Sequence, residues 1–502
     1  MKVSELFGRA EMEYPPELGD IEITEIVTDS RQVKDGCLFL CIRGLHTDGH
    51  EYVEDAIKAG AKVIVAEQVR DACVGGAAAR IVRKNTRKSA ALLYNAWYGN
   101  PTEKLTIIGV TGTNGKTSVC SMLFELFRAA GYRCGIIGTV CCRSADGRSL
   151  SHSKNGGLAN MTTPDPEELY AMLAEMAADG VQFVFMEVTS HALALHKVDA
   201  IRFDTAIFTN LTRDHLDFHG EMEEYYQAKK RLFSLCRQAL IHLADETGKR
   251  LLRELDCPVL TYSVGEGDYC ALIRKRKGME GFRLLITSPE ESFETDLPLV
   301  GEFSVQNALA ASAVALAYGI PSKTVCRVLS GTQGAVGRME RLTLSPPAPF
   351  SVLIDYAHTP DALEKLLRSV RDCRVGEERI VLLFGCGGER DRGKRKEMAI
   401  IASRLADRVI LTSDNSRGED PDQIFADILK GMDKEKEYTV IRDRREAIAY
   451  GVENARKGDI LILAGKGHET YEINGEGRRA FDEREIVREI WKRQCRGQID
   501  PT

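Results

Sequence analysis

The stretch GVTGTNGKTS, residues 109–118, decides the fold of the chain around it. It follows the apolar run LTIIGV at 105–110 and precedes a segment with one apolar helical face, formed by Val119, Met122, Leu123, Leu126 and Phe127. A strand, a glycine-rich turn and a helix N-terminus in this order direct backbone N–H groups and the positive end of a helix dipole at phosphate. The sequence therefore predicts a phosphate-binding loop, in which Lys116 reaches the terminal phosphates and the Thr117 hydroxyl binds Mg²⁺.

This loop departs from the general pattern G-x-x-x-x-G-K-[ST]. Val110 stands where that pattern has its first glycine, and Gly112 supplies a glycine two residues later. The alternative is a glycine-rich turn that binds nothing, but a lysine buried in such a turn without an anion would be costly. We therefore expect the loop to bind ATP or GTP through the residues Gly112, Thr113, Asn114, Gly115, Lys116, Thr117 and Ser118.

Strand and helix signals divide the chain into three α/β domains, at residues 1–99, 100–336 and 337–502. The first is a small domain with alternating strand and helix signals. The second continues from the phosphate loop with β-branched runs separated by helical stretches, which predicts a P-loop ATPase-like domain with a mainly parallel sheet. The third has strand candidates at 350–357, 379–385, 408–414, 438–444 and 458–465. Helical patterns between these runs predict a Rossmann-like doubly wound domain, whose ligands bind at the carboxyl ends of strands.

The composition is that of a soluble globular protein. The chain has 502 residues, of which 43% are hydrophobic and 28% charged, and its 68 basic and 74 acidic residues give a net charge of −6. We therefore expect no nucleic-acid partner. The sequence contains no run of about 18 apolar residues, so we expect no membrane span. The N-terminus lacks the apolar stretch of a signal peptide. The 14 cysteines contain no C-x-x-C pair, which favours free thiols in the cytoplasm over disulfides or zinc.

Motifs along the whole chain resemble those of the Mur ligase family, the ATP-dependent amide-forming enzymes of peptidoglycan precursor synthesis. The phosphate loop carries the family signature GTNGKTS, and ten further motifs follow the family order: DSRQVKDGCLFLCIRGLHTDGH (29–50), MTTPDP (161–166), EVTSHAL (187–193), NLTRDHLDFHG (210–220), YYQAKKRLF (225–233), GRMERL (337–342), DYAHTPDAL (355–363), FGCGGERDRGKR (384–395), SDNSRGEDP (413–421) and GKGHETYE (465–472). The resemblance is strongest to the branch that adds a diamino acid to UDP-MurNAc-L-Ala-D-Glu. It implies that ATP phosphorylates a substrate carboxylate and that the incoming amine attacks the acyl phosphate.

The resemblance also implies two Mg²⁺ sites in the middle domain. Thr117 and Glu187 would hold one ion, and His215 with Lys229, converted to N6-carboxylysine by CO₂, would hold the other. Lys116, Glu187, His215 and Lys229 would then be the catalytic residues. From the residues alone, Lys229 and Lys230 read as solvated helix lysines and His215 as a structural or surface histidine. Glu187 ends an apolar strand, where an ionised side chain needs a cation partner or a rim position.

Further roles carried over from the family complete the expected nucleotide and muramyl sites. Asn307 resembles the adenine contact, Arg338 a phosphate contact and Asp355 the ribose contact, with a helix cap, a salt bridge and a strand-end turn as their respective alternatives. The remaining expected contacts are to the UDP-muramyl substrate: Ser30 with uracil, and Thr162, Thr163, Ser190 and Lys197 with the muramyl-dipeptide. Lys197 replaces an arginine that is common in the family, which keeps the charge but loses the bidentate fork.

The amine donor is expected to bind the last domain. Members that use meso-diaminopimelate carry D-N-P-R, whereas this chain has Asp414-Asn415-Ser416-Arg417. The arginine fork would pair with the donor's distal carboxylate and repel the ammonium of lysine. Further donor contacts are expected from Arg390 (proximal carboxylate), Glu469 (distal ammonium) and Gly465.

Several alternatives to a diaminopimelate ligase stay open. L-Lysine could be the donor, since Ser416 departs from the motif. The same ATP core occurs in the D-Ala-D-Ala-adding ligase and in folylpolyglutamate synthetase, although DNSR and GKGHE speak against both. A non-ligase P-loop protein would not need Glu187, His215 and Lys229 together. We expect a monomer.

Overall fold

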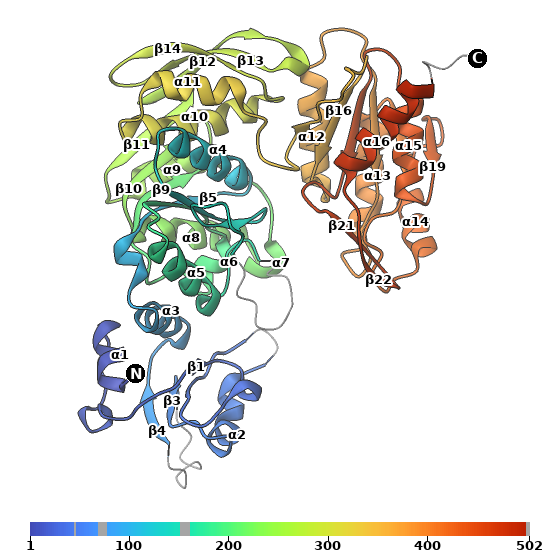
Figure 1. Cartoon of the computed structure of the whole chain (residues 1–502). Helices are drawn as coiled ribbons and strands as arrows, with labels where there is room; N and C mark the ends of the chain where they lie inside the picture. Colours follow the sequence, from blue (N-terminus) through green and yellow to red (C-terminus); the bar gives the residue numbers. More distant parts are fainter. Residues whose placement is uncertain (45–46, 69–77, 151–160, 498–502) are drawn as a thin grey trace. The chain divides into compact units, whose positions relative to one another are not determined.

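The computed structural model describes residues 1–44, 47–68, 78–150 and 161–497. It forms two compact units, Met1–Tyr262 and Ser263–Thr502, whose elements are labelled in Figure 1. Within the described ranges, no helix is both long and apolar enough to cross a membrane. The described cysteines are free thiols, and several of them, such as Cys236 and Cys257, are only partly buried.

The N-terminal part of the first unit is a four-stranded parallel sheet in the order β1-β2-β3-β4. Its elements are α1 (Val3–Arg9), β1 (Ile26–Val27), β2 (Leu38–Leu40), α2 (Val53–Lys58), β3 (Val63–Ala66), β4 (Ala79–Val82) and α3 (Thr86–Trp97). Strand β1 ends before Asp29, whose carboxylate accepts the Arg31 N–H and starts a 3-10 helix at Ser30–Gln32. Ser30 is therefore the first residue of this 3-10 helix.

The rest of the first unit is built on a sheet in the order β11-β10-β9-β5-β8-β6-β7, parallel except for β7. Its strands are β5 (Thr106–Thr111), β6 (Cys134–Ile137), β7 (Cys142–Arg143), β8 (Phe183–Glu187), β9 (Phe203–Phe208), β10 (Cys236–His242) and β11 (Val259–Val264). Its helices are α4 (Lys116–Ala129), α5 (Pro166–Ala178), α6 (Ser190–Ala194), α7 (Leu216–His219), α8 (Met222–Lys230) and α9 (Glu246–Glu254). Because β9, β5 and β8 are neighbours, the residues that follow them meet at one edge of the sheet.

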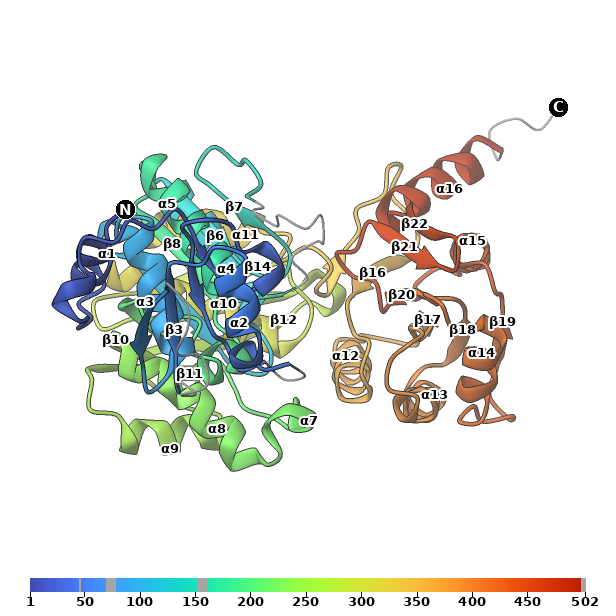
Figure 2. The same ribbon diagram turned by 90° about the horizontal axis from the view of Figure 1, so that it is seen from below.

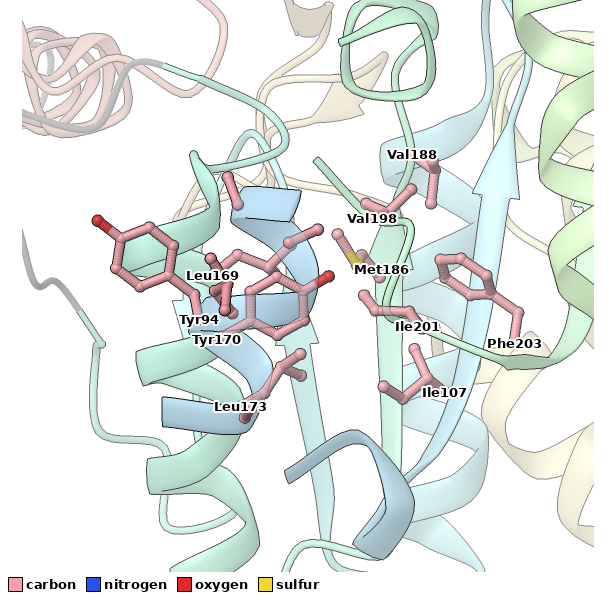
Figure 3. Packing of buried hydrophobic residues seen from close by; sticks show 14 of the residues in the cluster. Tyr94, Ile107, Leu169, Tyr170, Leu173, Met186, Val188, Val198, Ile201 and Phe203 are labelled. Carbon is pink, nitrogen blue, oxygen red and sulfur yellow. The ribbon is translucent and has the colours of Figure 1, made fainter. Parts of the chain in front are cut away.

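Apolar side chains from both parts of the first unit share one core (Figure 3). Leu169, Tyr170 and Leu173 of α5 lie beside Tyr94 of α3, and Ile107 and Met186 line the adjacent strands. Each fully buried aliphatic side chain contributes about 1.5–3 kcal/mol relative to exposure. Helix α5 thus packs against α3 of the N-terminal part and belongs to the same core as the central strands, so it joins the two parts of the first unit.

The second unit begins with an antiparallel meander, which sequence analysis did not predict, and two helices. These elements are β12 (Tyr269–Arg276), β13 (Phe282–Thr287), β14 (Ser292–Leu297), α10 (Glu302–Ala317) and α11 (Ser322–Gly331). A six-stranded sheet follows, in the order β15-β16-β20-β17-β18-β19, parallel except for β15. Its strands are β15 (Glu340–Arg341), β16 (Ser351–Asp355), β17 (Ile380–Phe384), β18 (Arg408–Leu411), β19 (Tyr438–Val440) and β20 (Ile460–Ala464).

Helices cover both faces of this sheet, which confirms the doubly wound prediction (Figure 2). One face packs against α12 (Pro360–Asp372), α13 (Gly393–Leu405) and α14 (Pro421–Leu429), and the other against α15 (Arg444–Glu453) and α16 (Glu483–Gly497). A hairpin of β21 (Tyr471–Asn474) and β22 (Gly477–Ala480) follows β20. The carboxyl ends of β17, β18 and β20 carry the predicted donor-site segments, and the carboxyl end of β16 carries Asp355. The α/β architecture with mainly parallel sheets is thereby confirmed.

Candidate functional site

The phosphate loop connects β5 to α4 in a conformation that depends on two glycines. Gly115 precedes α4 with a φ of +91°, a left-handed conformation that glycine adopts without strain. Gly112 has a φ of +151°, and a Cβ placed on it would lie only 1.9 Å from the Thr209 hydroxyl oxygen. Gly112 is therefore needed because the segment after β9 packs directly on the loop. Val110 is a buried residue of β5, so the missing first glycine of the general pattern lies within a strand.

The segment Thr209–Thr212 braces the loop through backbone and side-chain hydrogen bonds. The Thr113 N–H donates to the Asn210 carbonyl (2.9 Å), and the Asn114 N–H donates to Asn210 Oδ1 (3.0 Å). The Thr209 hydroxyl donates to the Asn114 carbonyl at 2.6 Å. Lys116 Nζ lies against the same loop, 2.9 Å from the Gly112 carbonyl oxygen. The loop is thus held in shape by Thr209 and Asn210, for which the sequence predicted no individual role.

Glu187, at the end of β8, is buried beside the start of α4. Its carboxylate accepts the Thr117 hydroxyl (2.9 Å) and both the N–H (2.8 Å) and the hydroxyl (3.2 Å) of Thr139. Glu187 is therefore buried and not at a rim, and its carboxylate contacts three neutral donors; the expected cation partner stays a prediction. The predicted pair Thr117 and Glu187 does come together, and Thr139 joins it. Thr139 follows β6, so the rule that ligands gather at strand carboxyl ends could have found it.

Thr162, Thr163 and Ser190 lie in the same region. The Thr139 and Thr162 hydroxyls are 2.9 Å apart, and the Thr163 hydroxyl donates to the Glu187 carbonyl at the same distance. The Ser190 hydroxyl is 2.8 Å from His219 Nε2. The threonine pair predicted for the muramyl-dipeptide is therefore adjacent to the pair predicted for Mg²⁺.

Lys229 of α8 is buried, with 2% of its surface exposed. Its Nζ donates to the Gly112 carbonyl at 2.9 Å and lies over the Tyr225 ring. Burial, and then the charge of Lys116, moves the pKa of Lys229 well below its usual value. Lys230, by contrast, pairs with Glu254 at 2.9 Å on a partly exposed face. The interpretation of both residues as solvated lysines was wrong for Lys229, whose amine lies at the phosphate loop.

His215 precedes α7 in a left-handed conformation, with a φ of +53°. Its ring is half exposed and lies 4.9 Å from the His191 ring, centroid to centroid. Burial, and then the neighbouring His215 and His219, lowers the pKa of His191 to about 4. Burial also lowers the pKa values of His215 and His219, which favours the neutral imidazole that binds metals. Among the described residues, no group of three or more His, Cys, Asp or Glu side chains is arranged to hold a metal ion.

The predicted nucleotide residues Asn307, Arg338 and Asp355 belong to the second unit. Asn307 is an interior residue of α10, whose N-cap is Gly301, so it is not a helix cap. Asp355 accepts the N–H groups of Met339 (2.7 Å) and Ala357 (2.8 Å), and burial raises its pKa. Asp355 is therefore a strand-end turn residue, as the alternative interpretation has it, and its contact with ribose stays a prediction. The Arg338 guanidinium lies over the Tyr356 ring at 4.7 Å.

The predicted donor residues converge at the carboxyl ends of β18 and β20. Asn415 Nδ2 donates to Glu469 Oε2 at 2.9 Å, and a Cβ on Gly465 would lie 2.9 Å from Asp414 Oδ2. Arg417 has a φ of +53°, and its guanidinium donates to the Gly388 carbonyl at 2.7 Å. The loop after β17 thus lies against the Asp414–Arg417 segment.

The remaining predicted substrate residues are Arg390, Ser30 and Lys197. Arg390 is exposed in the loop after β17, and Ser30 is partly exposed in the N-terminal part of the first unit. Lys197 is buried, and its ammonium pairs with Asp165 at 2.8 Å. Lys197, which replaces the family's arginine, thus forms an ion pair within the protein.

Sequence profiles of three Mur ligase domains match this chain in order. The Mur ligase family catalytic domain matches residues 22–98, the Mur ligase middle domain matches 110–315, and the Mur ligase glutamate ligase domain matches 337–467. The chain belongs to the Mur ligase family. The phosphate loop and Glu187 of this Mur ligase lie in the middle-domain match, and the Asp414–Arg417 segment lies in the glutamate ligase match.

Individual relatives match this Mur ligase over most of its length. The UDP-N-acetylmuramoyl-L-alanyl-D-glutamate–2,6-diaminopimelate ligase of Caldanaerobacter subterraneus subsp. tengcongensis is 41% identical over 473 residues, covering 94% of this chain and 95% of the relative. A solved structure of a ligase with the same name has a TM-score of 0.70 and 31% identity, covering 99% of this chain and 100% of that one. The Mycobacterium tuberculosis folylpolyglutamate synthase, solved with ADP and AMPPCP, shares the fold (TM-score 0.58, 20% identity, 83% and 96% covered).

Gly138→Ala tests the predicted Mg²⁺-binding role of Glu187 and is expected to lower kcat of this Mur ligase by about 100-fold, the size of effect that follows when an active-site group is misplaced by about 1 Å. A Cβ at this position would lie 2.3 Å from Glu187 Oε1 and displace the carboxylate from Thr117 and Thr139. Steady-state ADP formation measures the effect. Gly8→Ala is the matched control, because its Cβ would meet nothing within 4 Å, and its kcat should stay unchanged. A Gly138→Ala enzyme with full kcat would contradict the importance of the Glu187 position.

Proposed function

We propose that this Mur ligase adds meso-2,6-diaminopimelate to the D-glutamate carboxylate of UDP-N-acetylmuramoyl-L-alanyl-D-glutamate, in peptidoglycan precursor synthesis. The observation that carries the proposal is the convergence of Asn415, Arg417 and Glu469 at one edge of the C-terminal sheet. A guanidinium and a carboxylate at this site match the distal carboxylate and distal ammonium of diaminopimelate. The names of the full-length relatives support the same donor. L-Lysine, which lacks the distal carboxylate, is the alternative donor.

In the proposed reaction, the substrate carboxylate attacks the γ-phosphate of ATP, giving an acyl phosphate and ADP. The donor amine then attacks the acyl carbon, and inorganic phosphate leaves with formation of the amide bond. The backbone N–H groups of the loop and Lys116 would bind the phosphates and hold them in line for attack. In the second unit, Asn307 would contact adenine, Arg338 a phosphate and Asp355 the ribose.

The residues around the loop fit two Mg²⁺ ions. The hydroxyl of Thr117 and the carboxylate of Glu187, 2.9 Å apart, are hard oxygen ligands of the type that Mg²⁺ prefers. His215 and a carbamylated Lys229 would provide the ligands of the second ion. When bound, Mg²⁺ would neutralise charge on the phosphates and the substrate carboxylate.

The environment of Lys229 supports its carbamylation. Addition of CO₂ requires the neutral amine, and burial together with Lys116 favours that form. The nitrogen lone pair attacks CO₂, a proton leaves, and a carbamate with two acceptor oxygens and one negative charge results. Its charge would then be balanced by Lys116 and the metal.

The UDP-muramyl substrate would bind the first unit, with Ser30 at uracil and Thr162, Thr163, Ser190 and Lys197 at the muramyl-dipeptide. The donor would contact Arg390, Asp414, Asn415, Arg417, Gly465 and Glu469. We also propose a monomeric cytoplasmic enzyme with domain boundaries near residues 99 and 336.

A product assay with meso-diaminopimelate, L-lysine and L-ornithine offered side by side tests this function. We expect diaminopimelate to be incorporated and phosphate release to require both UDP-MurNAc-L-Ala-D-Glu and the donor. Preferred incorporation of L-lysine would overturn the donor assignment. Phosphate release from ATP alone, unaffected by either substrate, would overturn the ligase function and favour a non-ligase P-loop protein.

A further inference from the structure

Lys466 is a fully buried lysine next to the proposed donor site, and the sequence predicted no role for it. It follows β20, between Gly465 and Gly467, and 0% of its surface is exposed. Its Nζ donates to Asn415 Oδ1 and to the Tyr471 carbonyl, both at 2.9 Å. The carboxylates of Asp414 and Glu469 are each 3.8 Å away. One ammonium thus contacts or approaches three of the residues proposed to bind the donor.

Lys466 and the Ile473 N–H together determine which way the Asn415 amide faces. Asn415 Oδ1 accepts from Lys466 Nζ and from the Ile473 N–H, each at 2.9 Å. Both partners are donors only, so the atom that meets them must be the oxygen. The amide nitrogen is therefore turned toward Glu469, to whose Oε2 it donates at 2.9 Å. The other carboxylate oxygen of Glu469 is left to accept a ligand ammonium.

Lys466 also opposes the effect of burial on the two neighbouring carboxylates. Burial alone would raise the pKa of Asp414, but Lys466 and then Arg444 outweigh it and lower the pKa. Burial raises the pKa of Glu469, while the Asn415 hydrogen bond and the Lys466 charge act in the opposite direction. Removing the ammonium would therefore shift Glu469 further toward its neutral form, which binds an ammonium poorly.

We propose that Lys466 is a positioning residue for the amine donor, which orients Asn415 and Glu469 without touching the donor itself. This inference rests on the proposed function, since it assumes that the Asn415–Glu469 cluster binds the donor. The lysine is buried behind Asn415, so its contribution passes through that amide and through the ionised state of Glu469. We therefore expect that loss of Lys466 weakens binding of the donor and leaves binding of ATP and of the muramyl substrate unchanged.

Lys466→Met tests the proposal, because methionine keeps the length of the side chain and removes its charge. We expect the KM for the donor to rise by about 10- to 100-fold, the effect of losing one charge-assisted hydrogen bond. The kcat and the KM values for ATP and UDP-MurNAc-L-Ala-D-Glu should stay within about threefold, since none of these contacts changes. Lys466→Arg keeps the charge and should restore part of the donor affinity.

The control for general damage to the domain is Arg379→Met. Arg379 pairs with Asp459 at 2.7 Å and precedes β17, at the end of the strand away from the donor site. This change should lower the melting temperature and leave the donor KM unaltered. If Lys466→Met lowers kcat and raises all three KM values together with a lower melting temperature, the residue is merely structural and the proposal is wrong. An unchanged donor KM would also overturn it.

The pH dependence of the donor KM distinguishes a loss of the Lys466 charge from a loss of its packing. The groups that face Glu469 are Asn415, Lys466, Asp414, Arg417, Tyr356 and Tyr471. With Lys466 replaced by methionine, Glu469 ionises at higher pH, so the donor KM should fall as the pH is raised from about 6 to 8, more steeply than in the wild type. Parallel profiles for the two enzymes would overturn the proposal. The donor preference of the wild-type enzyme tests the function separately, because the comparison of variant with wild type uses whichever donor is incorporated.

Discussion

Lys229→Ala is expected to abolish amide-bond formation, with kcat lowered by about 1,000-fold or more, the range seen when a group that stabilises developing charge is lost. The structure places the Lys229 amine 2.9 Å from the Gly112 carbonyl, at the loop that would bind the phosphates. Its pKa is lowered by burial and by Lys116, so the carbamate can form. Alanine removes both the amine and any modification of it. The measurement is product formation at saturating concentrations of all three substrates.

Chemical rescue and a neighbouring lysine make this test specific. A short carboxylate such as acetate or propionate should restore part of the activity of Lys229→Ala, because it supplies the missing oxygens. Lys230→Ala is the matched control: Lys230 is the next residue of α8, pairs with Glu254 on a partly exposed face and should be replaceable with little change in kcat. Full activity of Lys229→Ala would remove the carbamate from the mechanism.

Arg417→Ala is expected to lower kcat/KM for meso-diaminopimelate by about 100- to 1,000-fold, because truncating one partner of a buried charge pair costs about 2–5 kcal/mol. The guanidinium is the group proposed to pair with the distal carboxylate, and it is already oriented by the Gly388 carbonyl at 2.7 Å. Steady-state kinetics with each substrate varied in turn measures the effect. The KM for ATP should not change, since the proposed nucleotide contacts are other residues.

Arg417→Lys serves as the matched variant for this prediction. It keeps the positive charge at the same backbone position but loses the two parallel hydrogen bonds of the fork, so an intermediate loss is expected. The preference for diaminopimelate over L-lysine should fall in both variants. Equal turnover of diaminopimelate before and after the Arg417→Ala change would contradict the role of the arginine.

The strand and helix pattern predicted most of the fold, because its strongest signals come from elements buried on both faces. The runs at β5, β8, β16, β17 and β20 are continuous apolar segments, as expected for parallel strands covered by helices. The meander β12–β14 was not predicted, although the alternation of buried and partly exposed residues along β13 is the pattern of a half-buried strand. The strand order, with β20 between β16 and β17, depends on long-range pairing that local periodicity does not contain.

For the candidate site, the sequence supplied the residue types but not their surroundings. The burial of Lys229 could not be inferred, because α8 is a polar helix whose buried face is set by the loop that packs on it. Thr139 and Thr209 carry no motif of their own and matter only through the Glu187 carboxylate and the phosphate loop. Lys466 lies within a recognised motif, yet its role depends on the hydrogen bond to Asn415, 51 residues away in sequence.

Asp355 ties the turn at residues 337–339 to the proposed nucleotide site. Its two carboxylate oxygens accept the N–H groups of Met339 and Ala357, so the same side chain holds this turn against the end of β16. If the ribose binds these oxygens as proposed, the turn and the nucleotide share one acceptor and are thermodynamically linked. Any substitution that loosens the turn then changes nucleotide affinity, and by reciprocity a bound nucleotide changes the stability of the turn by the same factor.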